Sequence, residues 1–195
     1  MARGKGDTLE RLYEAAVGLI GEHGYAGTTV DEIVDRAGVA KGTVYYHFKG
    51  KAALVSALLE DGLERLAASF KNEIEGTRGP EEALRALVHA ELAYIKRYQA
   101  FSTLVRSALW RVDRDWQASV GMLRERYVAV FAGVLADGVA RGVFRPELDI
   151  QATASTIFGM VATAALDWLV FAPQKALSDV ETNLSALVTG AVRVA

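Results

Sequence analysis

The hydrophobic residues of this chain recur at helical spacing along almost its whole length. Apolar side chains three and four positions apart form a stripe on one face of a helix. Such stripes predict a first helix around Leu12 to Ile20, two short helices over about 29–37 and 40–48, and further helices over about 51–74, 80–98, 101–110, 116–141, 150–171 and 179–194. No strand pattern, internal repeat or low-complexity tract interrupts them. The pattern predicts an all-α protein of about nine helices.

Residues at the expected helix ends support these boundaries. Pro80 suits the first position of a helix, where its missing N–H costs nothing. Asp149 suits the N-cap of the helix that follows it. Ser178 and Glu181 have the spacing of a capping box, which places the start of the last helix near Asp179.

The segment from Thr28 to Lys51, TTVDEIVDRAGVAKGTVYYHFKGK, is the most distinctive part of the pattern. Thr29 and Glu32 have capping-box spacing, and Gly38 suits a left-handed C-cap. The second helix of this segment turns Val44 and Phe48 inward. Its remaining side chains have little core to enter; they are Lys41, Gly42, Thr43, Tyr45, Tyr46 and His47. Two short helices around a sharp turn, with a polar and aromatic outer surface on the second, suit a DNA major groove.

The local charge agrees with this interpretation. The whole chain has a net charge of only −2, yet no Asp or Glu occurs between Arg36 and Leu59. Arg36, Lys41, Lys49 and Lys51 all fall in that stretch. Phosphate contacts require cations on one face rather than a high overall charge. The alternative is a small helical hairpin with a solvated basic edge, since such hairpins are common.

These residues resemble the N-terminal DNA-binding domain of the TetR family of bacterial transcriptional regulators. The resemblance is carried by Thr28-Thr29-Val30, Ile33, Ala37-Gly38-Val39, the run Lys41 to Phe48, Lys51 and Leu54, preceded by Leu12, Ala15, Ala16, Leu19, Ile20 and Gly24-Tyr25. The resemblance is strong over about the first quarter of the chain. Beyond that, only the expected arrangement of helices is similar. Ala40 departs from the family, which often has a capping serine there.

The pattern and the resemblance together assign roles at the DNA surface. Lys41, Gly42, Thr43 and Tyr45 are the candidates for contacts to base edges. The resemblance, and the affinity of hydroxyls and cations for phosphate oxygens, assign phosphate contacts to Thr29, Tyr46, His47 and Lys51. We expect residues 1–51 to form a three-helix DNA-binding domain and residues 52–195 to form a helical bundle for ligand binding and dimerisation.

Composition excludes several other classes of protein. The chain has 195 residues, of which 51% are hydrophobic, so a small module and one larger helical domain both fit. It has no cysteine, which rules out disulfides and thiolate metal sites. Its three histidines do not combine with acidic residues into a metal or acid–base motif. We therefore expect no enzyme activity, no metal and no cofactor; an all-helical enzyme is only a remote alternative.

The distribution of apolar residues also indicates where in the cell the protein is found. The N-terminus, MARGKGDTLE, lacks the apolar region of a signal peptide. Residues 152–172 are apolar enough to be mistaken for a membrane span, but they contain Asp167 and several hydroxyl residues, and their small residues suit helix packing. We expect a cytoplasmic protein without a membrane role.

The last two helices carry more apolar surface than a bundle of this size consumes. The stripes could complete the core of a single chain. The alternative that we favour is a four-helix interface between two copies, because a helix-turn-helix protein that reads a palindrome requires two. The same arrangement is what the TetR resemblance implies. The candidate interface residues are Ile157, Val161, Ala164, Trp168, Leu184, Leu187, Val188 and Ala191.

The middle helices hold most of the remaining aromatic residues. An apolar pocket with a few polar anchors is how helical bundles bind small molecules. The candidate ligand residues are Tyr94, Tyr98, Phe101, Arg106, Trp110, Trp116 and Tyr127. Taken singly, each aromatic residue is better explained as a member of an ordinary core. If they form a pocket, the effector is hydrophobic or aromatic, with Arg106 available for an anionic group.

The sequence thus predicts a regulator that represses transcription. In this interpretation a homodimer binds a palindromic operator on double-stranded DNA, and a small effector releases it. The alternative within the same class is an architectural or constitutive DNA-binding protein without a ligand.

Overall fold

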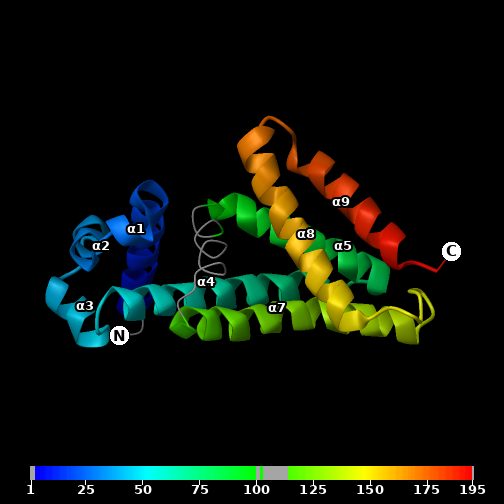
Figure 1. Ribbon diagram of the computed structural model, residues 1–195, viewed down its shortest axis with the longest axis horizontal. Coiled ribbons are helices and arrows are strands. Elements are labelled where there is room, and N and C mark those ends of the chain that lie inside the picture. The colour runs from blue at the N-terminus through cyan, green and yellow to red at the C-terminus, as the bar shows by residue number, and fades with distance from the viewer. Residues whose placement is uncertain (1–2, 100–101, 103–113, 195) are drawn as a thin grey trace. The chain divides into compact units, whose positions relative to one another are not determined.

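The computed structural model describes residues 3–99, 102 and 114–194, which form eight helices (Figure 1). These are α1 (Arg3–Gly27), α2 (Val30–Ala37), α3 (Lys41–His47), α4 (Lys51–Ile74), α5 (Pro80–Arg97), α7 (Arg114–Ala140), α8 (Ile150–Phe171) and α9 (Leu177–Val192). The helix expected over 101–110 lies outside the described residues. Among the described residues the only strand-like pairing is an isolated bridge between Phe144 and Arg193. The all-α prediction is confirmed.

The chain divides into two compact units. The first contains Met1–Leu63 and the start of α7 as far as Gly121, and the second is formed by Glu64–Gln99 and Met122–Ala195. The division falls within α4, twelve residues beyond the boundary that we expected at residue 51. The first half of α4 supplies Leu54, Val55 and Leu58 to the buried residues, with 0–2% of their surface exposed. The first half of α4 therefore packs with the DNA-binding helices, and the boundary between the two units lies later than the end of the helix-turn-helix sequence.

The first unit is built around the contact between α1 and α2. Each helix turns one apolar face inward, and the buried residues are Leu12, Tyr13, Ala15, Ala16, Leu19 and Ile20 from α1 and Val30, Ile33, Val34 and Ala37 from α2. From α3, Val44 is buried as predicted. The core thus fixes α2 and, through Val44, one face of α3.

The caps predicted for α2 are confirmed. The Thr29 hydroxyl accepts a hydrogen bond from the Glu32 amide at 3.2 Å, and the Glu32 carboxylate accepts one from the Thr29 amide at 2.7 Å. Gly38 takes the left-handed conformation, with φ 62° and ψ 37°, which a side chain with Cβ adopts only at a cost. The amides of Gly38 and Val39 then donate to the last carbonyls of α2. These bonds set the sharp turn into α3.

The second unit has an aromatic centre. Phe70 of α4 contacts the rings of Tyr127 and Phe131 of α7 edge-on, at 6.2 and 5.6 Å between ring centroids. Phe158 of α8 stacks on Tyr127 at 6.1 Å. Figure 1 shows α8 crossing this bundle. The apolar stripe of α5, formed by Leu84, Val88, Leu92 and Ile95, is buried too, and this helix packs against both α8 and α9.

Two predicted caps in this unit are confirmed and one is wrong. Pro80 occupies the first turn of α5, and the Asp149 carboxylate accepts from the Ala152 amide at 3.0 Å. The capping box at Ser178 does not form, because α9 already begins at Leu177. The Glu181 carboxylate instead lies 2.9 Å from Nδ1 of His89 on α5. A contact with another helix thus takes the place of the local cap.

The one described helix that is long and apolar enough to cross a membrane is α8, at Ile150–Phe171. Its inward stripe is buried in the second unit, through Ala154, Ile157, Val161, Ala165 and Trp168. The helix therefore has a place in the bundle that length and hydropathy alone do not reveal.

Candidate nucleic-acid interface

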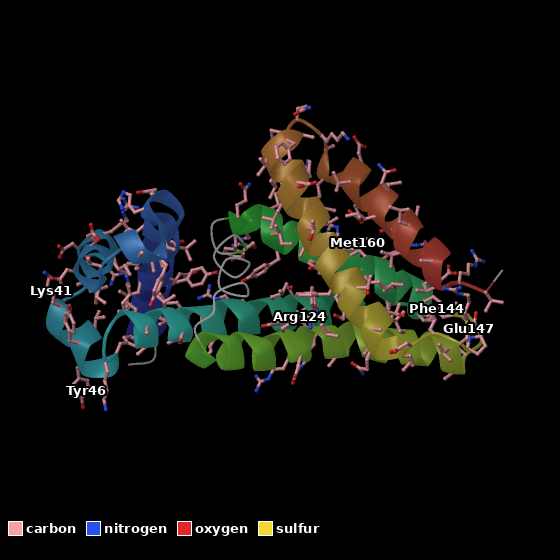
Figure 2. All side chains as sticks on the ribbon, in the orientation of Figure 1. Lys41, Tyr46, Arg124, Phe144, Glu147 and Met160 are labelled. Atoms are coloured by element: carbon pink, nitrogen blue, oxygen red, sulfur yellow. The ribbon has the colours of Figure 1, made fainter. Side chains whose placement is uncertain are left out.

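The outer face of α3 presents charged and aromatic side chains at the edge of the first unit. Lys41 and Gly42 are exposed, Tyr45 is 52% exposed and Tyr46 is 85% exposed. Figure 2 shows Lys41 and Tyr46 at the edge of this unit, with Tyr46 pointing away from α1 and α2. The side chains of Thr43 and His47 lie outside what the structure describes. Of the predicted base-edge residues, the structure thus brings together Lys41, Gly42 and Tyr45.

Gly42 leaves open space beside the backbone of α3. A Cβ atom placed there would meet no heavy atom within 4 Å. The helical backbone at this position accepts any residue, and the space beside it would hold a larger side chain. Neither conformation nor packing within the described chain therefore explains why residue 42 is glycine. The position instead leaves room for something outside the described chain to approach the backbone.

Lys41 and Tyr45 do not lie alone on this face. The Lys41 ammonium is 3.2 Å from one carboxylate oxygen of Asp31, and the Tyr45 hydroxyl donates to the other at 3.0 Å. The hydrogen bond from Lys41, followed by that from Tyr45, lowers the pKa of Asp31. The sequence reasoning missed Asp31, because it considered only the acid-free stretch after Arg36.

Thr29 has a second role in the fold besides its predicted phosphate contact. Its hydroxyl donates to the Glu32 carboxylate at 2.8 Å while it accepts from the Glu32 amide. The hydrogen bond from the Thr29 hydroxyl, and then that from its amide, lowers the pKa of Glu32. The hydroxyl is exposed, but the capping box already uses its proton.

Lys51 differs more clearly from the prediction. Its ammonium donates to the backbone carbonyls of Tyr25 at 2.7 Å and of Thr28 at 2.8 Å, and it lies 4.3 Å from the centre of the Tyr25 ring. Lys51 is half-buried, and these contacts fix the start of α4 to the last turn of α1 and to Thr28, which follows it. The structure therefore gives Lys51 a scaffolding role within the chain.

Of the other cations in the basic stretch, Arg36 is bound within the chain and Lys49 is not. Arg36 forms two hydrogen bonds with Glu22 of α1, at 2.8 and 2.9 Å, and so couples α2 to α1. Lys49, in the turn after α3, is exposed, and no described residue pairs with it. Lys49 is thus the cation of this edge that is most available to a phosphate.

The predicted ligand residues separate in the second unit. Tyr94 and Tyr98 pair at 4.7 Å between ring centroids and line a groove of about 300 Å³ between α4 and α5. Tyr127 is 1% exposed and belongs to the aromatic core, where burial raises its pKa. Phe101, Arg106 and Trp110, and the side chain of Trp116, lie outside the described part of the chain.

The groove also contains two arginines that the sequence did not indicate. Arg65 of α4 and Arg97 of α5 line it, together with Ser69 and Glu73. The Arg97 guanidinium lies 5.3 Å from the centre of the Tyr98 ring. Apolar rings and guanidinium groups therefore share this groove. Helical spacing alone could have placed Arg97 beside Tyr94, one turn away.

Most of the predicted dimer residues fill the core of the single chain. Ile157, Val161, Trp168, Leu184 and Val188 are only 0–6% exposed, because their stripes face α5. Ala164 is half-buried, Ala191 is exposed and Leu187 is 63% exposed. The large exposed apolar residues of α8 are Val170, at 67%, and Phe171, at 78%. The stripe that we selected from sequence is the inward stripe, and the outer faces carry a second apolar surface.

The described residues contain no group of three His, Asp or Glu that could hold a metal ion. They do contain one buried acid that the sequence reasoning overlooked. Glu91 of α5 is 1% exposed, and neither of its carboxylate oxygens has a hydrogen-bond partner. Burial raises the pKa of Glu91 well above its usual value.

Comparison with known proteins matches both parts of the chain. The family described as "Bacterial regulatory proteins, tetR family" matches residues 12–58, and "Tetracyclin repressor-like, C-terminal domain" matches residues 77–168. The HTH-type transcriptional repressor KstR2 of Mycobacterium tuberculosis is 30% identical over 141 residues, which are 72% of this chain and 70% of that protein. The fatty acid metabolism regulator protein of Bacillus subtilis is 22% identical over 160 residues, or 82% of each chain.

Solved structures share the fold over nearly the whole chain. The fatty acid degradation regulator FadR of Bacillus halodurans superposes with a TM-score of 0.86 at 23% identity, over 94% of this chain and 95% of that one. FadR of Bacillus subtilis, solved in complex with stearoyl-CoA, gives 0.84 at 20% identity, over 92% and 97%. The helix-turn-helix geometry, the two family matches and the KstR2 identity agree: this chain is a DNA-binding transcriptional regulator that belongs to the TetR family.

Proposed function

We propose that the chain is a repressor that binds a palindromic operator as a homodimer and is released by a small amphipathic effector. The observation that carries the DNA part is the outer face of α3, which presents Lys41, Tyr45 and Tyr46 beside an open backbone at Gly42. In this proposal the chain acts in the cytoplasm and by binding alone, without a catalytic step.

The contacts to DNA are assigned by chemistry and exposure. Lys41, Thr43 and Tyr45 meet base edges, and Gly42 lets the backbone of α3 approach the groove. Tyr46, His47 and Lys49 meet phosphates, since phosphate contacts come from cations and hydroxyls. Thr29 adds a phosphate contact only when its hydroxyl donates to the phosphate in place of the Glu32 carboxylate. Lys49 takes the place that the sequence gave to Lys51, because the Lys51 ammonium already binds two carbonyls.

The proposed dimer interface uses the outer faces of α8 and α9. Val170, Phe171 and Leu187 are 63–78% exposed, and they offer apolar surface that association with a second copy would bury. Ala164 and Ala191 lie on the same two helices and offer small residues for close packing. A palindromic operator requires two recognition helices, and a two-fold symmetric pair of chains supplies them.

The proposed effector site is the groove between α4 and α5. Tyr94 and Tyr98 offer aromatic surface, and Arg65 and Arg97 offer guanidinium groups that bind carboxylate or phosphate oxygens well. The groove thus fits a molecule with an apolar body and an anionic group. The stearoyl-CoA held by the FadR structure of Bacillus subtilis is a molecule of that kind.

A binding screen tests the effector site. Stearoyl-CoA, a free long-chain fatty acid and an aromatic carboxylate are each titrated into the protein–operator complex, with release followed by fluorescence anisotropy. We expect at least one probe to release DNA, and Arg97→Ala to weaken that release without changing operator affinity. Arg78→Ala, in the loop outside the groove, is the matched control. Equal release from the wild type, Arg97→Ala and Arg78→Ala would place the effector site outside this groove. If no probe releases DNA, a constitutive regulator without a ligand is favoured.

A further inference from the structure

Asp31 places a negative charge against the face of α3 that is assigned to DNA. It lies in the first turn of α2 and faces the recognition helix α3. One of its carboxylate oxygens is 3.2 Å from the Lys41 ammonium, and the other accepts from the Tyr45 hydroxyl at 3.0 Å. The side chains of Asp31 and Lys41 are about half exposed. One carboxylate therefore binds two of the side chains assigned to base contacts.

These contacts oppose the contacts that DNA would make. While Lys41 is paired with Asp31, its positive charge is locally neutralised and one of its three donors is in use. The Tyr45 hydroxyl has given its only proton to the same carboxylate. A base or phosphate that accepts from Tyr45 must therefore replace the carboxylate. One that binds Lys41 can use the two remaining donors, but it competes with the carboxylate for the positive charge, and the carboxylate itself repels approaching phosphates.

We propose that Asp31 is a specificity-determining residue that competes with DNA for Lys41 and Tyr45. The proposal rests on the assignment of α3 to the major groove. Duplexes of arbitrary sequence offer mainly phosphate contacts, which the carboxylate opposes. The operator offers base-edge acceptors that replace both Asp31 contacts at once. Asp31 thereby weakens non-specific binding more than operator binding.

The neighbouring acids do not share this position. Glu32 is engaged by Thr29, and Glu22 is engaged by Arg36. Asp35 lies one turn after Asp31 on α2 and is exposed, but it contacts neither Lys41 nor Tyr45 within hydrogen-bond distance. Substitution of Asp35 thus removes the same charge from the same helix without breaking the Asp31 contacts, and it serves as the matched control.

The test measures the salt dependence of binding by the intact protein. Asp31→Asn and Asp35→Asn are titrated against a duplex of arbitrary sequence and against an operator selected from random duplexes. We expect Asp31→Asn to bind the arbitrary duplex about two- to fivefold more tightly, the range that loss of an exposed ion pair allows. Its plot of log affinity against log salt should steepen by about 0.9, as for one more neutralised phosphate. The preference for the operator should fall.

A double-mutant cycle identifies the partner. In a Lys41→Met background, Asp31→Asn should no longer steepen the salt dependence, because the cation that it releases is absent. Asp31→Ser, which also suits a helix N-terminus, repeats the test if Asp31→Asn melts below the assay temperature.

Two results would overturn the proposal. One is weaker binding of Asp31→Asn to both duplexes with an unchanged salt slope, which a purely structural residue would give. The other is equal effects of Asp31→Asn and Asp35→Asn, which would reflect net charge alone. Failure of the underlying function looks different: the wild-type protein would then select no sequence, and Lys41→Met would bind DNA as well as the wild type.

Discussion

At the scale of single residues, two lysines that are two positions apart have different environments. Lys51 donates to two backbone carbonyls and lies over the Tyr25 ring, whereas Lys49 is exposed and no described residue pairs with it. A cation that is already bound inside the chain is costly to divert to a phosphate. Conversely, an exposed cation costs the fold little when it is removed. Stability and DNA affinity should therefore respond to different lysines.

Replacing Lys51 with alanine should lower the free energy of unfolding by about 1–2 kcal/mol, since hydrogen bonds to a charged donor are lost at a half-buried site. Lys49→Ala should leave the melting temperature unchanged. It should instead weaken all duplexes about equally and reduce the salt slope by about one. Thermal melts and anisotropy titrations on both variants check this. The assignment is wrong if Lys51→Ala keeps full stability and loses the salt slope.

Glu91 supplies a pH-dependent prediction at the same scale. Its raised pKa means that the folded chain keeps the proton at a pH where the unfolded chain, with a pKa near 4.5, has lost it. The folded state is therefore disfavoured progressively as pH rises above about 4.5, and the effect is absent below that value. Neutral glutamine at this position removes the dependence.

The Glu91→Gln variant should thus melt close to the wild type in acid and above it at neutral pH. The difference should grow by at most about 1.4 kcal/mol for each pH unit between the unfolded-state and folded-state pKa values of Glu91. Differential scanning fluorimetry over a pH series measures it. Glu125→Gln, at an exposed position on α7, is the control and should show no such divergence. A constant offset across all pH values would contradict the account.

At the scale of elements, a charge introduced on the inner face of α9 should prevent folding, whereas a charge on its outer face should prevent dimerisation. Val188 is 1% exposed and faces the core, whereas Leu187 is 63% exposed on the proposed interface. Val188→Arg should prevent folding, because it buries an unpaired charge. Leu187→Arg should instead give a folded monomer that binds the operator weakly. Sedimentation velocity with circular dichroism separates the outcomes; a wild-type monomer at micromolar concentration would contradict the interface.

Helix positions were predictable from sequence because they depend on local signals. The caps at Thr29, Gly38, Pro80 and Asp149 are formed by neighbours within four residues, and the structure reproduces each of them. The capping box predicted at the start of α9 does not form, and its Glu181 instead contacts His89, 92 positions away. A long-range contact of this kind leaves no periodic trace in the sequence.

Site residues were less predictable for a related reason. The exposed face of α3 follows from periodicity, since Val44 points inward and Lys41 and Tyr45 point outward. Whether a polar side chain is available to DNA depends on its partner within the chain. The partners of Lys41 and Lys51 lie 10 and 23–26 positions away, so helical periodicity does not reveal them. On α8 and α9 periodicity gave one apolar stripe for each helix, but not whether that stripe faces the core of the chain or a second copy.

At the scale of the whole molecule, regulation requires that effector binding alters DNA affinity. An effector that binds one conformation of the second unit better than another shifts the population of that conformation. A coupling of about 1–3 kcal/mol would release operator DNA about 5- to 150-fold more readily. The helix α4 carries groove residues in its second half and packs in the first unit with its first half, so it is the element through which we expect the coupling to pass.

The central claim is sequence-specific binding through α3, and selection from a pool of random duplexes tests it most directly. The wild-type protein should enrich one inverted repeat, and Lys41→Met and Tyr45→Phe should each lose or change the preference at defined positions in both half-sites. The Lys49→Ala variant should select the same repeat with lower affinity. Enrichment of no motif, or the same motif with the same affinity from the wild type and both α3 variants, would contradict the account.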